Sequence, residues 1–136
     1  MTISKDIKFD CAHMLSGYEG KCANLHGHTY HGTVTLEGKV NGNGMVLDYN
    51  KIKQIVDEFD HAIVFSAQNI RNEAENKLHE WAVNYDMKYV VLHTGKSTAE
   101  RIAEYLAVSF LLPGVESVYI RLSETDGSWA EAEAHA

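Results

Sequence analysis

Apolar and polar residues alternate along both ends of the chain. This period of two predicts long strands over residues 4–13 and 25–38. Residues 116–124 and 128–134 alternate in the same way on either side of an Asp-Gly turn, which predicts a second pair of strands. Each end of the chain therefore favours an antiparallel pair.

Two segments in the middle of the chain place apolar residues at helical spacing. Asp48 is a suitable N-cap for a helix over residues 49–59, and Ser97-Thr98-Ala99-Glu100 has the pattern of a capping box that opens another helix. The predicted apolar faces comprise Ile52, Ile55, Val56 and Phe59 in the first helix and Ile102, Ala103, Leu106 and Phe110 in the second. Both helices have one face suited to covering a sheet.

The segment between these helices is less regular. Residues 68–84 predict a more polar helix, and residues 89–92 predict a short buried strand. Strand pairs that flank helices favour an antiparallel sheet with the helices on one face. We therefore predict one α+β domain over residues 1–136, with an open sheet edge on each side that oligomerisation could cover.

Composition excludes several classes of protein. The chain has 136 residues, of which 45% are hydrophobic and 23% charged, as in an ordinary soluble domain. No apolar run approaches the roughly 20 residues that span a membrane, and no signal-peptide pattern opens the sequence, so we expect a cytoplasmic protein. The net charge of -7, without adjacent Lys or Arg residues, argues against a nucleic-acid partner.

His26-Gly27-His28 is the first motif that indicates chemistry. Alternate residues of a strand face the same side, so both imidazoles point one way. His13 ends the neighbouring predicted strand, and a hairpin would bring all three imidazoles together. Three neutral histidines with an open fourth position are the ligand set of a catalytic zinc site.

The two cysteines have different surroundings in the sequence. Cys11 shares a predicted strand face with His13, so we expect it to pack in the core. Cys22 lies in the loop four residues before His26. It could be a fourth zinc ligand in a closed structural site, a nucleophile or base beside the metal, or a small buried thiol.

Two further positions carry groups suited to catalysis or binding. Asp60 could orient His61 as a general acid-base pair, or the two residues could form a solvated helix end. Glu124 ends an apolar strand, where its carboxylate could accept hydrogen bonds from a guanidine-like ring edge or simply face solvent. The short motifs leave both alternatives open.

Six motifs follow one another along the chain: Phe9-Asp10-Cys11-Ala12-His13, Cys22-Ala23-Asn24-Leu25-His26-Gly27-His28-Thr29-Tyr30, Gly44-Met45-Val46-Leu47-Asp48-Tyr49, Asp60-His61, Thr98-Ala99-Glu100 and Ser123-Glu124-Thr125. In this order they resemble the motifs of the 6-pyruvoyl-tetrahydropterin synthase and 6-carboxy-tetrahydropterin synthase family. The resemblance extends over about residues 6–133. The block from Cys22 to His28 is specific, and the other motifs gain weight as an ordered set.

The resemblance implies a tunnelling fold, in which a four-stranded antiparallel sheet carries two long helices. It implies trimers that close a twelve-stranded barrel and stack into hexamers. It also implies a set of functional residues: Zn²⁺ on His13, His26 and His28, joint action of Cys22, Asp60 and His61 across a subunit interface, and Glu124 as the anchor of the pterin ring.

The three residues between Cys22 and His26 resemble the spacing in bacterial 6-carboxy-tetrahydropterin synthases of queuosine synthesis. Animal-type pyruvoyl synthases have a longer gap, and a folate-linked branch carries glutamate near the cysteine position. The resemblance therefore implies a lyase that converts 7,8-dihydroneopterin triphosphate to 6-carboxy-5,6,7,8-tetrahydropterin, acetaldehyde and triphosphate. A pyruvoyl-type synthase and a non-enzymatic zinc module are the alternatives.

The sequence departs from the family pattern in two places. The usual Pro-Thr-x-Glu-Asn reads Ser97-Thr98-Ala99-Glu100-Arg101, and residues 66–96 form an extra helix and strand that short family members lack. The triphosphate site is not located by any motif. Lys21, Arg71 and Lys96 are candidates through charge and loop position alone.

Overall fold

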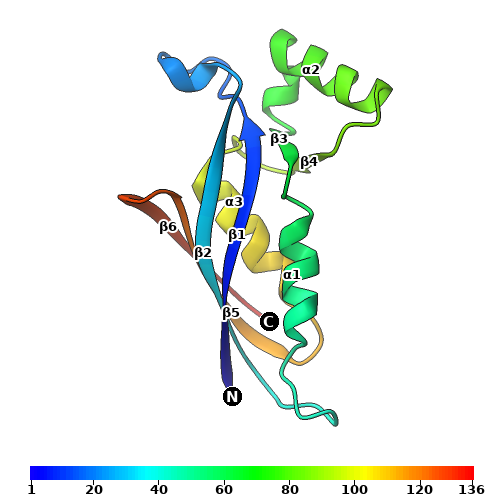
Figure 1. Ribbon diagram of the computed structural model, residues 1–136, viewed down its shortest axis with the longest axis vertical. Helices are drawn as coiled ribbons and strands as arrows, with labels where there is room; N and C mark the ends of the chain where they lie inside the picture. The colour runs from blue at the N-terminus through cyan, green and yellow to red at the C-terminus, as the bar shows by residue number, and fades with distance from the viewer.

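One long, twisted sheet organises the computed structural model, which describes residues 1–136 (Figure 1). Its six strands are arranged in the order β4-β3-β1-β2-β5-β6. In chain order they are β1 (Thr2–His13), β2 (His26–Gly38), β3 (Ala62–Ser66), β4 (Tyr89–Leu92), β5 (Val115–Thr125) and β6 (Ser128–His135). The four long strands lie where the alternation of apolar residues predicted them.

The four predicted antiparallel strands are present, but the sheet contains two further strands that the prediction of a four-stranded antiparallel sheet did not include. β1, β2, β5 and β6 pair antiparallel, but β3 and β4 extend the sheet beyond β1 in parallel. Four of the five residues of β3 are buried, so the strand reads as a continuous apolar run without alternation. For that reason β3 was absent from the sequence prediction, whereas β4 was predicted with its observed bounds.

Two of the three helices cover one face of the sheet. α1 (Tyr49–Asp57) packs against β1, and α3 (Ala99–Ser109) packs against β5 and β6. α2 (Glu73–Asn84) instead lies at the end of the molecule where β1 ends and β2 begins, near the short 3-10 turns η1 (Lys21–Ala23) and η2 (Asn69–Arg71) (Figure 1). The extra segment around residues 66–96 is thus placed at that end.

The caps of α1 and α3 differ from each other. Asp48 caps α1 as predicted, because its Oδ1 accepts the N–H of Asn50 at 2.8 Å. The predicted capping box at Ser97 is wrong: Thr98 is the N-cap of α3, and it makes no side-chain hydrogen bond to the helix. Ser97 is buried, and its Oγ has no hydrogen-bond partner.

The hydrophobic core fills the space between the sheet and the two covering helices. The predicted apolar residues of both helices are buried within it. Phe9 and Tyr30 stack with their ring centroids 5.1 Å apart, and Phe59 of the turn after α1 lies 5.6 Å from Phe9. Each such side chain contributes about 1.5–3 kcal/mol when fully buried. This packing fixes the register of β1 and β2 next to the three histidines on the same face of the sheet.

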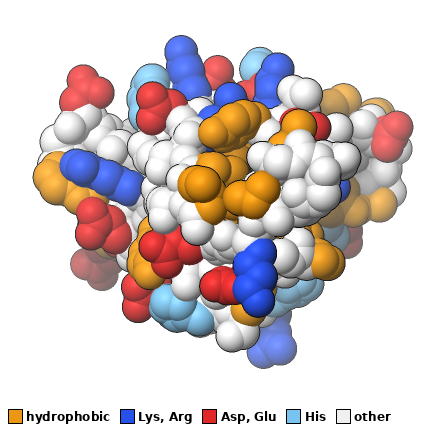
Figure 2. Space-filling model, turned by 90° about the horizontal axis from the view of Figure 1, so that it is seen from below, with side chains coloured by type: hydrophobic (Ala, Val, Ile, Leu, Met, Phe, Trp, Pro, Cys, Tyr) orange, Lys and Arg blue, Asp and Glu red, His pale blue; other side chains and the backbone are white.

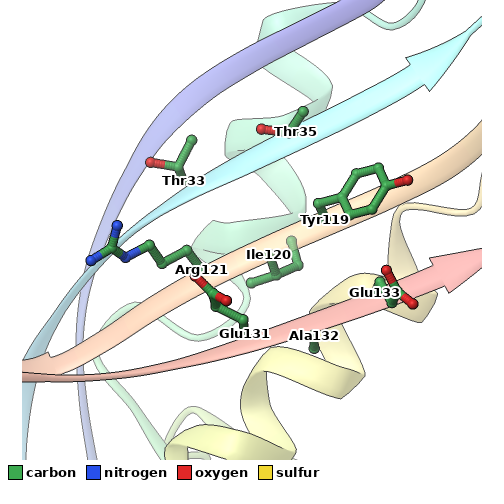
Figure 3. Close-up of a pocket in the computed structure, with 8 residues that line it drawn as sticks. All are labelled: Thr33, Thr35, Tyr119, Ile120, Arg121, Glu131, Ala132 and Glu133. Atoms are coloured by element: carbon green, nitrogen blue, oxygen red, sulfur yellow. The ribbon is translucent and has the colours of Figure 1, made fainter.

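The other face of the sheet is polar. Hydrogen bonds connect neighbouring strands there, including Ser4 to Thr35 at 2.9 Å and Thr33 to Asp6 at 3.2 Å. Figure 3 shows how this face continues across β2, β5 and β6, with Thr33, Thr35, Tyr119, Arg121, Glu131 and Glu133 along its surface. No helix of the chain covers these side chains.

The surface shown in Figure 2 mixes side chains of both charges. None of the helices combines the length and apolar character that crossing a bilayer requires. Hydrophobic side chains gather near the centre of the end shown in Figure 2, and Lys and Arg side chains around them are interspersed with Asp and Glu. This end of the molecule therefore has no concentrated basic patch.

Candidate functional site

The three predicted zinc ligands converge on the helix-covered face of the sheet. His13 at the end of β1 lies opposite His26 in the antiparallel register, and His28 follows two residues later on the same face. The coordinating nitrogens of the three rings all lie within 4.8 Å of one another, with 3.1 Å between Nε2 of His13 and Nε2 of His26. The predicted convergence of the imidazoles is confirmed.

Backbone carbonyls orient two of these rings. Nδ1 of His13 faces the carbonyl oxygen of buried Ser97, and Nδ1 of His26 lies 2.7 Å from the carbonyl oxygen of Asn24. A carbonyl accepts only, so each Nδ1 carries the proton and each Nε2 keeps a free lone pair. Burial lowers the pKa of His13, which favours the neutral ring. The arrangement fits a zinc ion held by three nitrogens with an open fourth position.

Glu124 lies at the rim of this histidine cluster. Its Oε1 is 3.3 Å from Nε2 of His28 and 3.8 Å from Nε2 of His13. The pairing of β5 with β6 shifts register between Ser123 and Thr125, and a bulge of this kind re-aims a side chain. The carboxylate is one-third exposed, so a bound molecule could still reach it.

Tyr30 is a site residue that the sequence reasoning missed. It is fully buried, and its hydroxyl donates to Oε1 of Glu124 at 3.4 Å. Burial raises the pKa of Tyr30, so the phenol stays protonated and remains a donor. The signal was present in the sequence, because Tyr30 shares a strand face with His26 and His28 at period two.

Asp60 and His61 form the predicted pair and are anchored to β1. Oδ2 of Asp60 lies 2.9 Å from Nδ1 of His61, while Oδ1 accepts the N–H of Asp10 at 2.9 Å. The N–H of His61 donates to the carbonyl oxygen of Asp10 at 2.6 Å. These contacts lower the pKa of Asp60, with the Asp10 N–H as the main cause. The pair is therefore held in place rather than free at a helix end.

The backbone of His61 adopts a left-handed conformation, with φ of 60°. Non-glycine residues rarely adopt a left-handed backbone conformation, and such conformations concentrate at functional sites. The ring is exposed and borders a pocket whose lining includes Asp10, His28 and Thr29. Asp10 and Thr29 alternate with the histidine ligands along β1 and β2, so they belong to the opposite, polar face, and the carboxylate of Asp10 lies within 4.8 Å of the ligand atoms of Asp60 and His61. Asp60 and His61 therefore lie across the sheet from the histidine cluster.

Cys22 reaches neither group within one chain. It lies half-buried in η1, and its carbonyl accepts the N–H of Leu15 at 3.0 Å. It is absent from the group of ligand atoms that contains the three histidines, so this chain forms no closed four-ligand site. Cys11 is buried in the core as predicted, where burial raises its pKa to about 12.

The three basic candidates for the triphosphate lie in separate turns. Lys21 begins η1 and Arg71 ends η2, and both side chains are exposed. Lys96 lies in the loop between β4 and α3 and is half-buried. None of the three forms an ion pair within the chain, so each positive charge is available to an anion.

A family model and a named relative each match nearly the whole of this chain. The family model described as 6-pyruvoyl tetrahydropterin synthase matches residues 2–135. A Haemophilus influenzae protein named 6-carboxy-5,6,7,8-tetrahydropterin synthase is 35% identical over 139 residues, which cover 95% of this chain and 96% of that protein.

Solved structures of similar fold carry a related name. The 6-pyruvoyl tetrahydropterin synthase of Plasmodium vivax superimposes with a TM-score of 0.61 at 18% identity, covering 100% of this chain and 99% of that one. The Caenorhabditis elegans 6-pyruvoyl tetrahydropterin synthase gives a TM-score of 0.55 at 25% identity, covering 100% and 95%. The resemblance predicted from the ordered motifs is confirmed.

Proposed function

The chain belongs to the 6-pyruvoyl tetrahydropterin synthase family, and we propose that it is a zinc-dependent carbon-carbon lyase of queuosine biosynthesis. Its substrates are 7,8-dihydroneopterin triphosphate and one water molecule, and its products are 6-carboxy-5,6,7,8-tetrahydropterin, acetaldehyde and triphosphate. The observation that carries the proposal is the convergence of His13, His26 and His28 beside Glu124. The name of the Haemophilus influenzae relative supports the carboxy-type product.

The three histidines would hold the zinc ion through nitrogen donors. When bound, zinc supplies a Lewis acid for the two hydroxyls of the substrate side chain. Glu124 accepts hydrogen bonds from the aminopyrimidine edge of the pterin ring, and the Tyr30 hydroxyl keeps its carboxylate in place. The pterin ring and the reacting side chain are thereby fixed at the same time.

Proton transfers in this reaction belong to Cys22 and His61. The Cys22 thiolate removes a carbon-bound proton beside the ring, and His61 moves protons during carbon-carbon cleavage. Asp60 keeps one ring nitrogen of His61 occupied, because its Oδ2 lies 2.9 Å from Nδ1. The other nitrogen, Nε2, is then the one that exchanges protons with substrate.

The placement of Asp60 and His61 across the sheet from the zinc ligands supports an active site shared between subunits. Both outer strands of the long antiparallel sheet have open edges: β6 has no neighbour beyond it, and β1 pairs with β3 only at Cys11 and Ala12. Joining such edges between copies would close a ring and hide exposed backbone groups. We therefore assign a trimer or hexamer as the active form.

Incubation with 7,8-dihydroneopterin triphosphate, followed by mass identification of the products, tests the reaction. Acetaldehyde together with 6-carboxy-5,6,7,8-tetrahydropterin is the expected result. Loss of triphosphate without release of acetaldehyde would identify a pyruvoyl-type synthase instead. Light scattering tests the assembly, where a fully active monomer would remove the argument for a shared site.

A further inference from the structure

Glu75 on α2 is buried without a part in the proposed chemistry. Its side chain is fully inaccessible to solvent, and its Oε1 accepts two hydrogen bonds from Ser16, at 3.2 Å from the backbone nitrogen and 2.5 Å from Oγ. Its other oxygen, Oε2, has no partner. A buried carboxylate that is incompletely paired costs free energy, and an apolar side chain would fill the same space at less cost.

The start of α2 does not need this carboxylate. Glu75 is the third residue of the helix, where a glutamate ordinarily turns back to the N–H of the N-cap residue. Here the N-cap is Asn72, and its N–H already donates to the carbonyl oxygen of Asn69 at 2.8 Å. The Asn72 side chain accepts the N–H of Ala74 at 3.1 Å. The carboxylate of Glu75 is therefore not needed as a cap of α2, and it bonds instead to Ser16 outside the helix.

Ser16 lies in the loop that carries Cys22. This β1–β2 loop comprises residues 14–25, and it is closed by the N–H of Leu15, which donates to the carbonyl oxygen of Cys22 at 3.0 Å. Leu15 and Ser16 are adjacent, so two consecutive contacts connect Glu75 to the backbone of Cys22. No other residue of the extra segment around residues 66–96 hydrogen-bonds to this loop. Figure 1 shows α2 and η1 at the same end of the molecule.

We propose that Glu75 is a positioning residue that holds the β1–β2 loop, and with it the Cys22 thiol, where proton abstraction requires it. The inference rests on the proposed function, since it takes Cys22 as the base. It gives the extra segment around residues 66–96 a specific task in the reaction. The carboxylate itself touches neither the substrate nor the metal ligands.

The test compares four variants of the full-length, zinc-loaded protein. Glu75→Ala removes both acceptor bonds, Ser16→Ala removes only the hydroxyl bond, and Ser16→Thr keeps that bond. Glu80→Ala is the matched control, because Glu80 lies on the same helix but is exposed and pairs only with Lys77. The two readouts are kcat with KM, and the rate at which iodoacetamide alkylates Cys22, followed by peptide mass.

We expect Glu75→Ala to lower kcat at least about tenfold and Ser16→Ala to lower it about threefold, because small misplacements of a reacting group are costly. KM and zinc content should change little, and alkylation of Cys22 should become severalfold faster as the loop loosens. Ser16→Thr and Glu80→Ala should match the unmodified protein in both readouts.

A purely structural Glu75 predicts a different pattern. Melting temperature would fall, but kcat and the alkylation rate of the folded protein would stay unchanged well below that temperature, and this result would overturn the proposal. Should Glu75→Ala fail to fold, Ser16→Ala and Ser16→Thr decide the same question. Alkylation needs no substrate, so unchanged alkylation refutes the inference on Glu75, whereas absence of product from the unmodified protein refutes the proposed function.

Discussion

The histidine cluster and the Asp60–His61 pair occupy the two opposite faces of one sheet. His13 in the cluster is 2% exposed and is oriented by a buried carbonyl, and burial lowers its pKa. The side chain of His61 is 77% exposed, and its neighbour is a carboxylate whose pKa is lowered by hydrogen bonds. One face thus favours a neutral ring at His13, and the other places an imidazole beside a negative charge.

Under the proposed function, this contrast separates metal binding from proton transfer. A metal ligand must present a free lone pair, and desolvation keeps the ring neutral without any further group. A proton carrier must reach solvent and substrate in both protonation states, which exposure and a neighbouring carboxylate permit. Because the two groups project from opposite faces of the sheet, we propose that they act on one substrate when they come from different chains. The predictions below test this division.

The largest effect is expected for His26→Ala. Two remaining imidazoles hold a catalytic zinc ion poorly, so metal content and activity should be lost together. His31→Ala is the matched control, because His31 lies on the same strand but is exposed on the polar face, opposite Lys8. Elemental analysis of both variants provides the measurement. Full zinc occupancy in His26→Ala would contradict the assigned ligands.

Cys22→Ala should abolish proton abstraction and leave the histidine cluster intact. General base catalysis is typically worth roughly 100- to 10,000-fold, so kcat should fall within that range. Zinc content and melting temperature should stay near those of the unmodified protein, because Cys22 is no part of the ligand group. Cys11→Ala, which removes a buried core thiol, should keep most of the activity. Zinc loss from Cys22→Ala would instead favour a ligand role.

Mixing two inactive variants tests whether the histidine cluster of one chain acts together with His61 of a neighbouring chain. His26→Ala chains lack the metal site, and His61→Ala chains lack the proton carrier. In a random trimer, about one interface in four combines an intact cluster with an intact His61 from the neighbouring chain, so about a quarter of full activity should return. The measurement is turnover before and after joint refolding. An absence of recovery, with mixed trimers shown by mass, would place the whole site within one chain.

The histidine cluster was predictable because it depends on one hairpin. Alternation along β1 and β2 fixes which residues face the core, and the two strands are neighbours in the chain. The face on which His13, His26 and His28 lie therefore follows from the local pattern. The same reasoning placed Cys11 in the core. The strand and helix bounds agree with the structure to within a few residues for the same reason.

Other features depend on contacts that no local pattern encodes. The anchoring of Asp60 and His61 at Asp10 requires β3 to lie parallel to β1, and β3 has no alternation. Glu124 reaches His28 through a bulge whose register is set by β6. Glu75 occupies the position of an ordinary capping-box glutamate, and its burial depends on a loop almost 60 residues earlier.

The smallest effect is expected for Asp60 on the polar face, and it concerns how the stability of the protein depends on pH. The N–H of Asp10 and the ring of His61 hold the pKa of Asp60 below its ordinary value of 3.8. The folded protein then binds this proton less readily than the unfolded chain, so the stabilisation is present above about pH 4 and is lost as pH falls through the folded pKa. Because the side chain is 37% exposed, solvent screens these contacts and the effect is modest.

Asp60→Asn removes the titrating group and keeps the shape of the side chain. The unmodified protein should melt at a higher temperature than the variant near neutral pH, and this difference should shrink as pH is lowered from about 5 to 3. Asp126→Asn, in the exposed turn between β5 and β6, is the control and should leave the pH profile unchanged. Melting curves across that pH range provide the measurement. A difference that stays constant or grows toward low pH would show that Asp60 is not held as the ionised partner of His61. The polar face would then lack the charge that distinguishes it from the histidine cluster.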